Sequence, residues 1–309
     1  MFHSLKSLEA FESGISVIEV SHISERLDGV VSYCKQDAGT QDTGTTNPEF
    51  WQIAAENCDF EILPEDFLTF NKLEKLFIGR NKIKAIPDDI ARFACLKELY
   101  IYGNALKTLP ESLGSLPELR ILDLSHQRLV SLPDTIGNLK KLEILYASNT
   151  EITDLPESLW RLNKLKYLNL TDNKLTRLPE MVSNLSALRE FRLYNNHLTD
   201  LPDSLSLLKN LRELYLNGNQ LKKLPENIGM LKSLEVLDLR NNRIGAIPES
   251  LGEAKNLIHL DLRANHFTKL PECLAKLPNL KKLDLRWSHL REHPAWLQSL
   301  EDRGCAIYL

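Results

Sequence analysis

The stretch LNLTDNKLTRLPE, residues 168–180, holds the pattern on which most of the chain is built. The same skeleton returns 23 residues later as FRLYNNHLTDLPD, and after another 23 residues as LYLNGNQLKKLPE. Repeats of this kind begin at every 23rd residue from Leu73 to Leu280, ten in succession without an insertion. A fixed period of this length is typical of a solenoid, in which each repeat is one structural unit stacked on the next.

The first half of the repeat predicts a strand and a turn. Its L-x-L piece alternates with period two, so we expect a short strand whose leucines face inward. The ninth position is asparagine in seven of the ten repeats and is Gln127, Thr150 or Ser288 in the others. An amide has both donors and an acceptor. We therefore expect this side chain to satisfy backbone groups of its own turn and of neighbouring turns.

The second half predicts a short helix or 3₁₀ segment. Every repeat has a proline, from Pro87 to Pro294, and an acidic residue follows it in nine of the ten. Proline suits the first turn of a helix because its φ is fixed and it lacks an N–H. An acidic residue there faces the positive end of the helix dipole. One such unit cannot bury its own leucines, so the repeats must stack their strands into one parallel sheet.

The motif LxxLPxxIxxLxxL, over about residues 50–302, resembles that of leucine-rich repeat proteins. It is similar to the 23-residue subclass found in plant Ras-group-related proteins, Scribble-type scaffolds and bacterial leucine-rich repeat proteins. The resemblance implies an α/β solenoid, a horseshoe with a concave parallel sheet and short helices or 3₁₀ turns on the convex side.

The repeats divide the chain into four predicted parts. Residues 1–49 form an N-terminal flanking segment with a flexible loop at 36–48, since QDAGTQDTGTTNP is polar and rich in glycine and threonine. Residues 50–72 are a degenerate repeat that caps the solenoid, residues 73–302 are the ten repeats, and residues 303–309 are a C-terminal cap strand.

Composition limits the setting of the protein. The chain has 309 residues and a formal charge of −4, which gives no general attraction to nucleic acid. It has neither an apolar run long enough for a membrane helix nor a signal-peptide pattern. The five cysteines are odd in number and form no C-x-x-C, so we expect reduced thiols. These features favour a monomeric cytoplasmic protein, or one delivered into a host cytosol if it is a bacterial effector.

The concave face carries the candidate binding residues. Six of the eight tyrosines fall at strand positions three, five and seven, which point away from the leucines. Tyrosine is common at interfaces. A simple strand preference would also place aromatics inward, where Phe191 is alone among the full repeats. The predicted partner-binding residues are Phe77, Tyr100, Tyr102, Tyr146, Tyr167, Arg192, Tyr194 and Tyr215. Arg192 could hold a partner's carboxylate with two hydrogen bonds.

The last three full strands repeat the sequence LDLR, which sets an aspartate row beside an arginine row. These residues are Asp238, Arg240, Asp261, Arg263, Asp284 and Arg286. The rows form either a surface lattice that neutralises itself or a polar docking rim. The lattice is favoured because opposite rows satisfy each other.

Catalytic motifs are missing from the sequence. His197, His266 and His289 share an exposed turn position, so we expect solvated histidines and no metal site, and no cofactor is expected. The sequence predicts a non-enzymatic protein–protein interaction module, of scaffold or effector type, that binds a partner protein on the concave face. The alternative is a small-ligand or glycan receptor, or an enzyme, in the tyrosine-lined groove, which would need a closed pocket.

Overall fold

The computed structural model describes residues 51–309. The predictions for the flanking segment 1–49, its loop at 36–48 and Phe50 lie outside the described residues. The longest helix in the described part has seven residues, and no helix there is long and apolar enough to cross a membrane.

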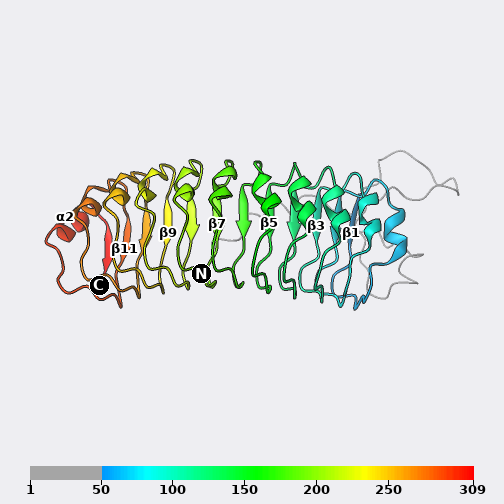
Figure 1. Ribbon diagram of the computed structural model, residues 1–309, viewed down its shortest axis with the longest axis horizontal. Helices are drawn as coiled ribbons and strands as arrows, with labels where there is room; N and C mark the ends of the chain where they lie inside the picture. The colour runs from blue at the N-terminus through cyan, green and yellow to red at the C-terminus, as the bar shows by residue number, and fades with distance from the viewer. Residues whose placement is uncertain (1–50) are drawn as a thin grey trace.

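Twelve strands of three residues each lie side by side in one parallel sheet, in the order of the chain (Figure 1). The strands are β1 Gln52–Ala54, β2 Lys75–Phe77, β3 Glu98–Tyr100, β4 Ile121–Asp123, β5 Ile144–Tyr146, β6 Tyr167–Asn169, β7 Glu190–Arg192, β8 Glu213–Tyr215, β9 Val236–Asp238, β10 His259–Asp261, β11 Lys282–Asp284 and β12 Ala306–Tyr308. From β1 to β11 each residue pairs with the residue 23 positions away, as Leu145 does with Leu168. The sheet is open, and it confirms the predicted solenoid.

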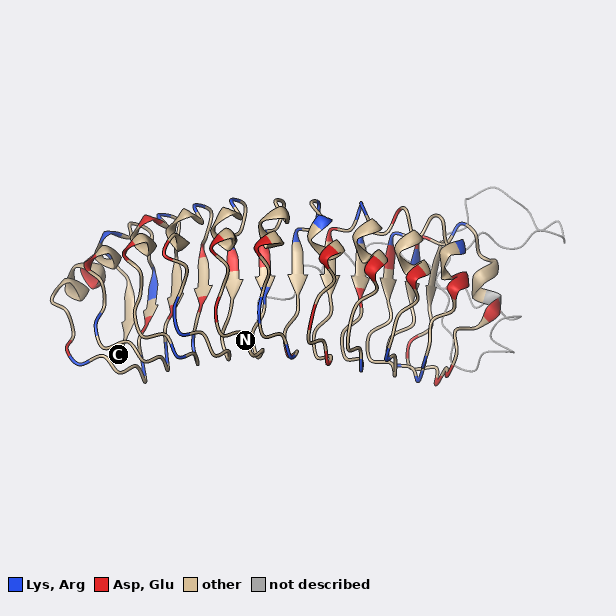
Figure 2. Ribbon diagram, in the orientation of Figure 1, with Lys and Arg blue, Asp and Glu red and all other residues tan. Residues whose placement is uncertain are grey.

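The predicted short helices are 3₁₀ helices. They are η2 Glu65–Thr69, η3 Asp88–Arg92, η4 Glu111–Ser115, η5 Asp134–Asn138, η6 Glu157–Arg161, η7 Glu180–Asn184, η8 Asp203–Leu207, η9 Ile228–Met230, η10 Glu249–Glu253 and η11 Glu272–Lys276. Pro133, with φ −66°, stands before η5, and the amide of Leu139 closes its last turn by donating to the Ile136 carbonyl at 3.2 Å. Figure 2 shows the acidic residues that recur on successive short helices.

A continuous apolar core fills the space between the sheet and the 3₁₀ helices. Within one repeat, Leu165, Leu168 and Leu170 have no exposed surface, and Leu175 is 1% exposed. Burying one such side chain contributes about 1.5–3 kcal/mol before conformational entropy is subtracted. The buried leucines of all the repeats form one cluster, so the core belongs to the stack and not to any single repeat.

The asparagines of the ninth position bind backbone groups of two repeats at once, as the sequence predicts. The Asn173 amide nitrogen donates to the Leu170 carbonyl of its own turn at 3.0 Å and to the Ala147 carbonyl of the preceding repeat at 2.8 Å. Its oxygen accepts from the Ile152 amide, also in the preceding repeat, at 3.1 Å. The asparagines therefore tie successive turns together.

These asparagine contacts form a ladder of hydrogen bonds along the stack. The repeats without asparagine at the ninth position fit this ladder less well. Gln127 keeps part of it, because its oxygen accepts from the Leu106 amide at 3.1 Å and its nitrogen donates to the Ile101 carbonyl. Thr150 instead directs its hydroxyl at the Asn173 side chain. A single hydroxyl cannot reach two carbonyls and an amide at the same time, so the turn at Thr150 is the weaker copy.

The C-terminal end departs from the 23-residue period. A true α-helix, α2 Trp296–Asp302, takes the place of a 3₁₀ segment, and Gly304 follows it with φ +83°. Strand β12 then pairs Ala306 with Lys282, a step of 24 residues. Tyr308, and not Ile307, therefore continues the column of Asp284.

Successive 3₁₀ helices approach closely at the nineteenth position of the repeat. A Cβ added to Gly114, Gly137 or Gly229 would overlap the backbone carbonyl oxygen of the next repeat. Trp160 occupies the same position in its own repeat and is 1% exposed. The glycines let the helices pack tightly, whereas a buried tryptophan takes this position in η6.

We predict that Asn196→Ala lowers the free energy of unfolding by about 1–3 kcal/mol, because the buried backbone groups that it serves lose their partner. Its amide nitrogen donates to the Leu170 carbonyl at 2.9 Å and its oxygen accepts from the Leu175 amide at 3.0 Å. Thr150→Asn, which restores the ladder residue, should be neutral or stabilising. Urea melts of both variants check this, and an Asn196→Ala protein as stable as wild type would contradict the ladder.

We predict that Gly229→Ala destabilises the protein by about 1–3 kcal/mol, since its methyl group would overlap the Ser250 carbonyl oxygen. Gly245→Ala is the matched control, because nothing lies within 4 Å of the added Cβ. Thermal melts should show a loss for the first variant and none for the second. Equal melting temperatures would mean that the helices are not close-packed at this position.

Candidate interaction surface

The open face is defined here as the side of the sheet turned away from the leucine core, at strand positions three, five and seven. All eight predicted partner-binding residues lie on it: Phe77, Tyr100, Tyr102, Tyr146, Tyr167, Arg192, Tyr194 and Tyr215. Each of these side chains is half-buried. The structure therefore brings them together on one continuous surface across β2 to β8.

Stacking between neighbouring strands fixes several of the rings. Phe77 and Tyr100, which pair across β2 and β3, stack with centroids 4.7 Å apart and an interplanar angle of 5°. Tyr146 and Tyr167 lie 4.8 Å apart at 47°. Both separations are close to the spacing of strands in a sheet. The rings thus pack side by side at the spacing of the strands that carry them.

Tyr102 is seated on a glycine. A Cβ at Gly79, one strand away, would lie 2.6 Å from the Tyr102 ring, so only glycine leaves room for it there. Burial and a hydrogen bond to Glu56 raise the pKa of Tyr102 to about 12. The Arg80 guanidinium lies 5.7 Å from the ring centroid. The ring therefore has a defined position against its neighbours.

Arg192 is held inside the face by its own neighbours. Its guanidinium carbon lies 5.6 Å from the Tyr167 ring centroid and 5.2 Å from that of Tyr215. Its Nε donates to Glu190 at 2.5 Å. Burial opposes the charge, but Tyr167 and Glu190 outweigh it and raise the pKa of Arg192. One donor is thus already in use, and the predicted contact with a partner's carboxylate stays a prediction.

The acidic partners of these rings were not among the predicted site residues. The Tyr215 hydroxyl donates to Glu213 at 2.6 Å, and the Tyr100 hydroxyl donates to Glu98 at 3.3 Å. Each glutamate lies two residues before its tyrosine. Since residues i and i+2 share one face of a strand, the sequence contained the signal for these pairs.

The LDLR rows form a lattice of ion pairs. Arg263 donates to Asp261 through Nη2 at 2.6 Å and lies 3.3 Å from Asp284. Arg286 donates to Asp284 at 2.8 Å. Burial opposes the charge of Asp284, but the hydrogen bond from Arg286 and the charge of Arg263 outweigh it and lower the pKa. A docking role for Asp238, Arg240, Asp261, Arg263, Asp284 and Arg286 stays a prediction.

Two aromatic residues extend this end of the face beyond the predicted set. Tyr308 of β12 lies 5.2 Å from the Arg286 guanidinium carbon, and Trp287 lies 5.4 Å from the same atom. Trp287 is 72% exposed. The strict 23-residue period hides Tyr308, because the step to β12 is one residue longer.

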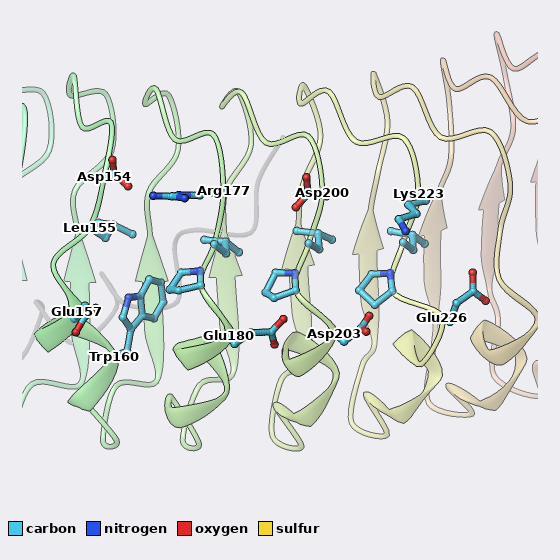
Figure 3. Close-up of a pocket in the computed structure, with 16 residues that line it drawn as sticks. Asp154, Leu155, Glu157, Trp160, Arg177, Glu180, Asp200, Asp203, Lys223 and Glu226 are labelled. Carbon is cyan, nitrogen blue, oxygen red and sulfur yellow. The ribbon is translucent and has the colours of Figure 1, made fainter.

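A separate groove runs along the flank of the solenoid, where the chain passes from the asparagine turn to the 3₁₀ helix (Figure 3). It has a volume of about 850 Å³ and an apolar floor of Leu-Pro pairs with Trp160. One rim alternates in charge and the other is acidic. The rims are Asp154, Arg177, Asp200 and Lys223 on one side and Glu157, Glu180, Asp203 and Glu226 on the other. None of the predicted site residues lines this groove.

The histidines of the tenth position do not gather around a common point. His266 and His289 stack ring on ring, with centroids 4.9 Å apart and planes 8° from parallel. Across residues 51–309, no three His, Cys, Asp or Glu side chains are placed to hold a metal ion.

Family models match most of the chain. The model described as "Leucine-rich repeat region" matches residues 109–220 and 202–302, and "Leucine rich repeat" matches residues 71–129. The chain belongs to the leucine-rich repeat family. Comparison with curated proteins gives no match. Membership in this family indicates a binding module and not a class of enzyme.

Solved leucine-rich repeat structures share the fold. A TDR receptor is 29% identical with a TM-score of 0.66, and the match covers 72% of this chain and 40% of that one. The plant peptide hormone receptor RGFR1, in complex with RGF2, is 25% identical with a TM-score of 0.59, covering 73% and 42%. The GASSHO1/SCHENGEN3 ectodomain from Arabidopsis thaliana, in complex with CASPARIAN STRIP INTEGRITY FACTOR 2, is 27% identical with a TM-score of 0.56, covering 80% and 36%. The matches thus span about two fifths of each receptor chain.

We predict that Asp238→Asn stabilises the protein at pH 7.5 and not at pH 4. Burial, opposed by Arg240 and reinforced by Asp261, raises the pKa of Asp238 to about 6. The folded state therefore holds this proton more tightly than the unfolded chain does, and stability falls as pH rises from about 4 through 6. Asparagine should restore about 1–2 kcal/mol at pH 7.5, after an allowance for solvent screening.

Asp284→Asn is the matched control, since Asp284 occupies the same column and also has an arginine two residues on. Its pKa is lowered, so its charge stabilises the fold at neutral pH, and the variant should lose stability at pH 7.5. Melting temperatures measured at both pH values decide the matter. A loss for Asp238→Asn at pH 7.5 would contradict the electrostatic assignment.

Proposed function

We propose that this leucine-rich repeat protein is a non-enzymatic interaction module, of scaffold or effector type, that binds a partner protein across β3 to β8 of the open face. The observation that carries the proposal is the band of six tyrosines at positions that the core does not use. Tyrosine and arginine supply much of the binding energy at protein interfaces. The leucine core would form equally well with small polar residues in these places.

The tyrosine side chains of the band are held in fixed positions, which supports a binding role. Tyr102 packs against Gly79, Tyr146 contacts Tyr167 at a tilt, and the Tyr215 hydroxyl donates to Glu213. Side chains that are already fixed lose little entropy when a partner covers them. A surface of this kind is suited to binding without rearrangement.

Two of the structural neighbours support a protein or peptide partner. RGFR1 is seen in complex with RGF2, and the GASSHO1/SCHENGEN3 ectodomain in complex with CASPARIAN STRIP INTEGRITY FACTOR 2. By analogy we assign a protein partner to this chain. A ligand or glycan site is less well supported, because the 850 Å³ flank groove contains none of the tyrosines.

The proposal includes a reducing, cytoplasm-like compartment. Cys95, Cys273 and Cys305 are free thiols in the described part of the chain. Burial raises the pKa of Cys273 to about 11, so this thiol remains protonated at neutral pH. Free thiols of this kind are typical of proteins kept reduced.

We predict that Tyr146→Ala and Tyr194→Ala each weaken binding by about 2 kcal/mol or more, roughly 30-fold, because buried interface aromatics contribute this much. The partner is first captured from lysate of the native cells, and calorimetric titration then ranks the variants. Stability should change little, since neither ring belongs to the core.

Leu207→Ala and Met230→Ala are the controls, because these apolar side chains are 47% and 46% exposed on the 3₁₀ helices. They should bind the partner like wild type. Equal losses from the tyrosine and control variants, or none from the tyrosines, would rule out the open face as the site.

A further inference from the structure

The tyrosine-bearing part of the open face has an excess of negative charge. At strand positions three, five and seven from β1 to β8, five carboxylates accompany two cations. The carboxylates are Glu56, Glu98, Asp123, Glu190 and Glu213, and the cations are Lys75 and Arg192. Lys75 pairs with Glu98 at 2.9 Å and Arg192 with Glu190 at 2.5 Å. Three carboxylates are left without a cation among the described residues of this surface.

Asp123 differs from the other two. Glu56 and Glu213 accept hydrogen bonds from the hydroxyls of Tyr102 and Tyr215, respectively. The Asp123 carboxylate instead accepts from the Ser125 backbone amide at 2.9 Å. Burial raises its pKa, and hydrogen bonds from Ser125 and the charge of His126 only partly offset this. A carboxylate in this position would be stabilised by a nearby cation.

Aromatic rings flank Asp123 on both sides. In the sheet register it lies between Tyr100 of β3 and Tyr146 of β5. These two residues are two strands apart, which is about 10 Å at the usual spacing. At position three, the half-buried Ile121 of β4 and Ile144 of β5 border the site. The result is a carboxylate between two rings with an apolar edge.

The same molecule holds an arginine between two tyrosine rings elsewhere on the open face. Arg192 on β7 lies between Tyr167 of β6 and Tyr215 of β8, at 5.6 Å and 5.2 Å from their centroids, with Glu190 as its counterion. Those two rings are offset, since Tyr167 is at position three and Tyr215 at position five, yet they show that rings two strands apart on this sheet can hold a guanidinium between them. At Asp123 the rings and the carboxylate are present. His126 favours the charged carboxylate, but no lysine or arginine of the described residues forms an ion pair with it.

The geometry points to an arginine-binding site at Asp123. An arginine side chain of the partner protein inserts between Tyr100 and Tyr146, and its guanidinium forms an ion pair with the Asp123 carboxylate. Its methylene stem lies along Ile121 and Ile144. This assignment rests on the proposed function and adds to it the chemistry of the partner, which must present an exposed arginine.

Arginine fits the site better than lysine. A guanidinium is planar and stacks on aromatic faces, and it can donate two parallel hydrogen bonds to one carboxylate. It is also less strongly hydrated than an ammonium group, so it loses less hydration free energy when it enters a half-buried site.

The test uses the full chain and a probe of known chemistry, N-acetyl-arginine methylamide. Tyrosine ring resonances are followed by NMR during the titration and assigned with single Tyr→Phe variants. We expect the Tyr100 and Tyr146 signals to move first. The uncharged isostere N-acetyl-citrulline methylamide should bind at least fivefold more weakly.

Asp123→Asn is the decisive variant, because asparagine keeps the shape and the acceptor for the Ser125 amide and removes only the charge. It should lower the affinity for the arginine probe at least fivefold. Glu213→Gln, which removes a charge elsewhere on the face, is the matched control and should bind the probe like wild type. Circular dichroism melts confirm that both variants are folded.

Three results would overturn the assignment. These are equal affinity for the arginine and citrulline probes, undiminished binding by Asp123→Asn, or tighter binding of N-acetyl-lysine methylamide than of the arginine probe. The probe experiment needs no partner, so it fails independently of the proposed function. Loss of partner binding in Tyr146→Ala without selectivity for the arginine probe would leave the function standing and remove only this site.

Discussion

A 23-residue repeat can bury its leucines only against the next repeat, and the rest of the structure follows from this constraint. The strands have three residues each, too short to be stable in isolation, and the core runs through all of them as one stripe. The asparagine amide makes the stacking specific. Asn242 donates to the Leu216 carbonyl of the preceding repeat at 3.0 Å and accepts from the Leu221 amide at 3.0 Å. A stack held in this way has a fixed register, which places every side chain of the open face.

That fixed register separates the residues that fold the protein from those that can recognise a partner. Inward positions are mostly leucine, and the nineteenth position holds a glycine that cannot be enlarged in several repeats, with Trp160 as an exception. Positions three, five and seven are under neither restraint, so tyrosines and charged groups can occur there at little cost to the core. The open face can therefore change its chemistry without changing the scaffold.

The sequence predicted the features that repeat within one unit. Strand positions, the asparagine contacts and the short segments after each proline follow from spacing alone, although the choice of 3₁₀ over α-helix does not. Contacts that depend on the particular residues of single repeats were missed. Gly79 seats Tyr102, Glu190 holds Arg192, and Tyr308 aligns with Asp284 through a 24-residue step. These contacts depend on which residues occur in one repeat or its neighbour, and a template averaged over the repeats removes that information.

The two ends of the face show how much a single neighbouring position decides. Asp123 and Asp284 occupy the same column, yet the pKa of the first is raised and that of the second is lowered. Two residues on, Asp284 has Arg286, whereas Asp123 has Ser125. An arginine at position seven forms an ion pair with the carboxylate at position five, so the protein neutralises this charge itself. A serine leaves it between Tyr100 and Tyr146 with its charge opposed by burial, so the tyrosine-bearing end is the part of the face where an outside cation has most to add.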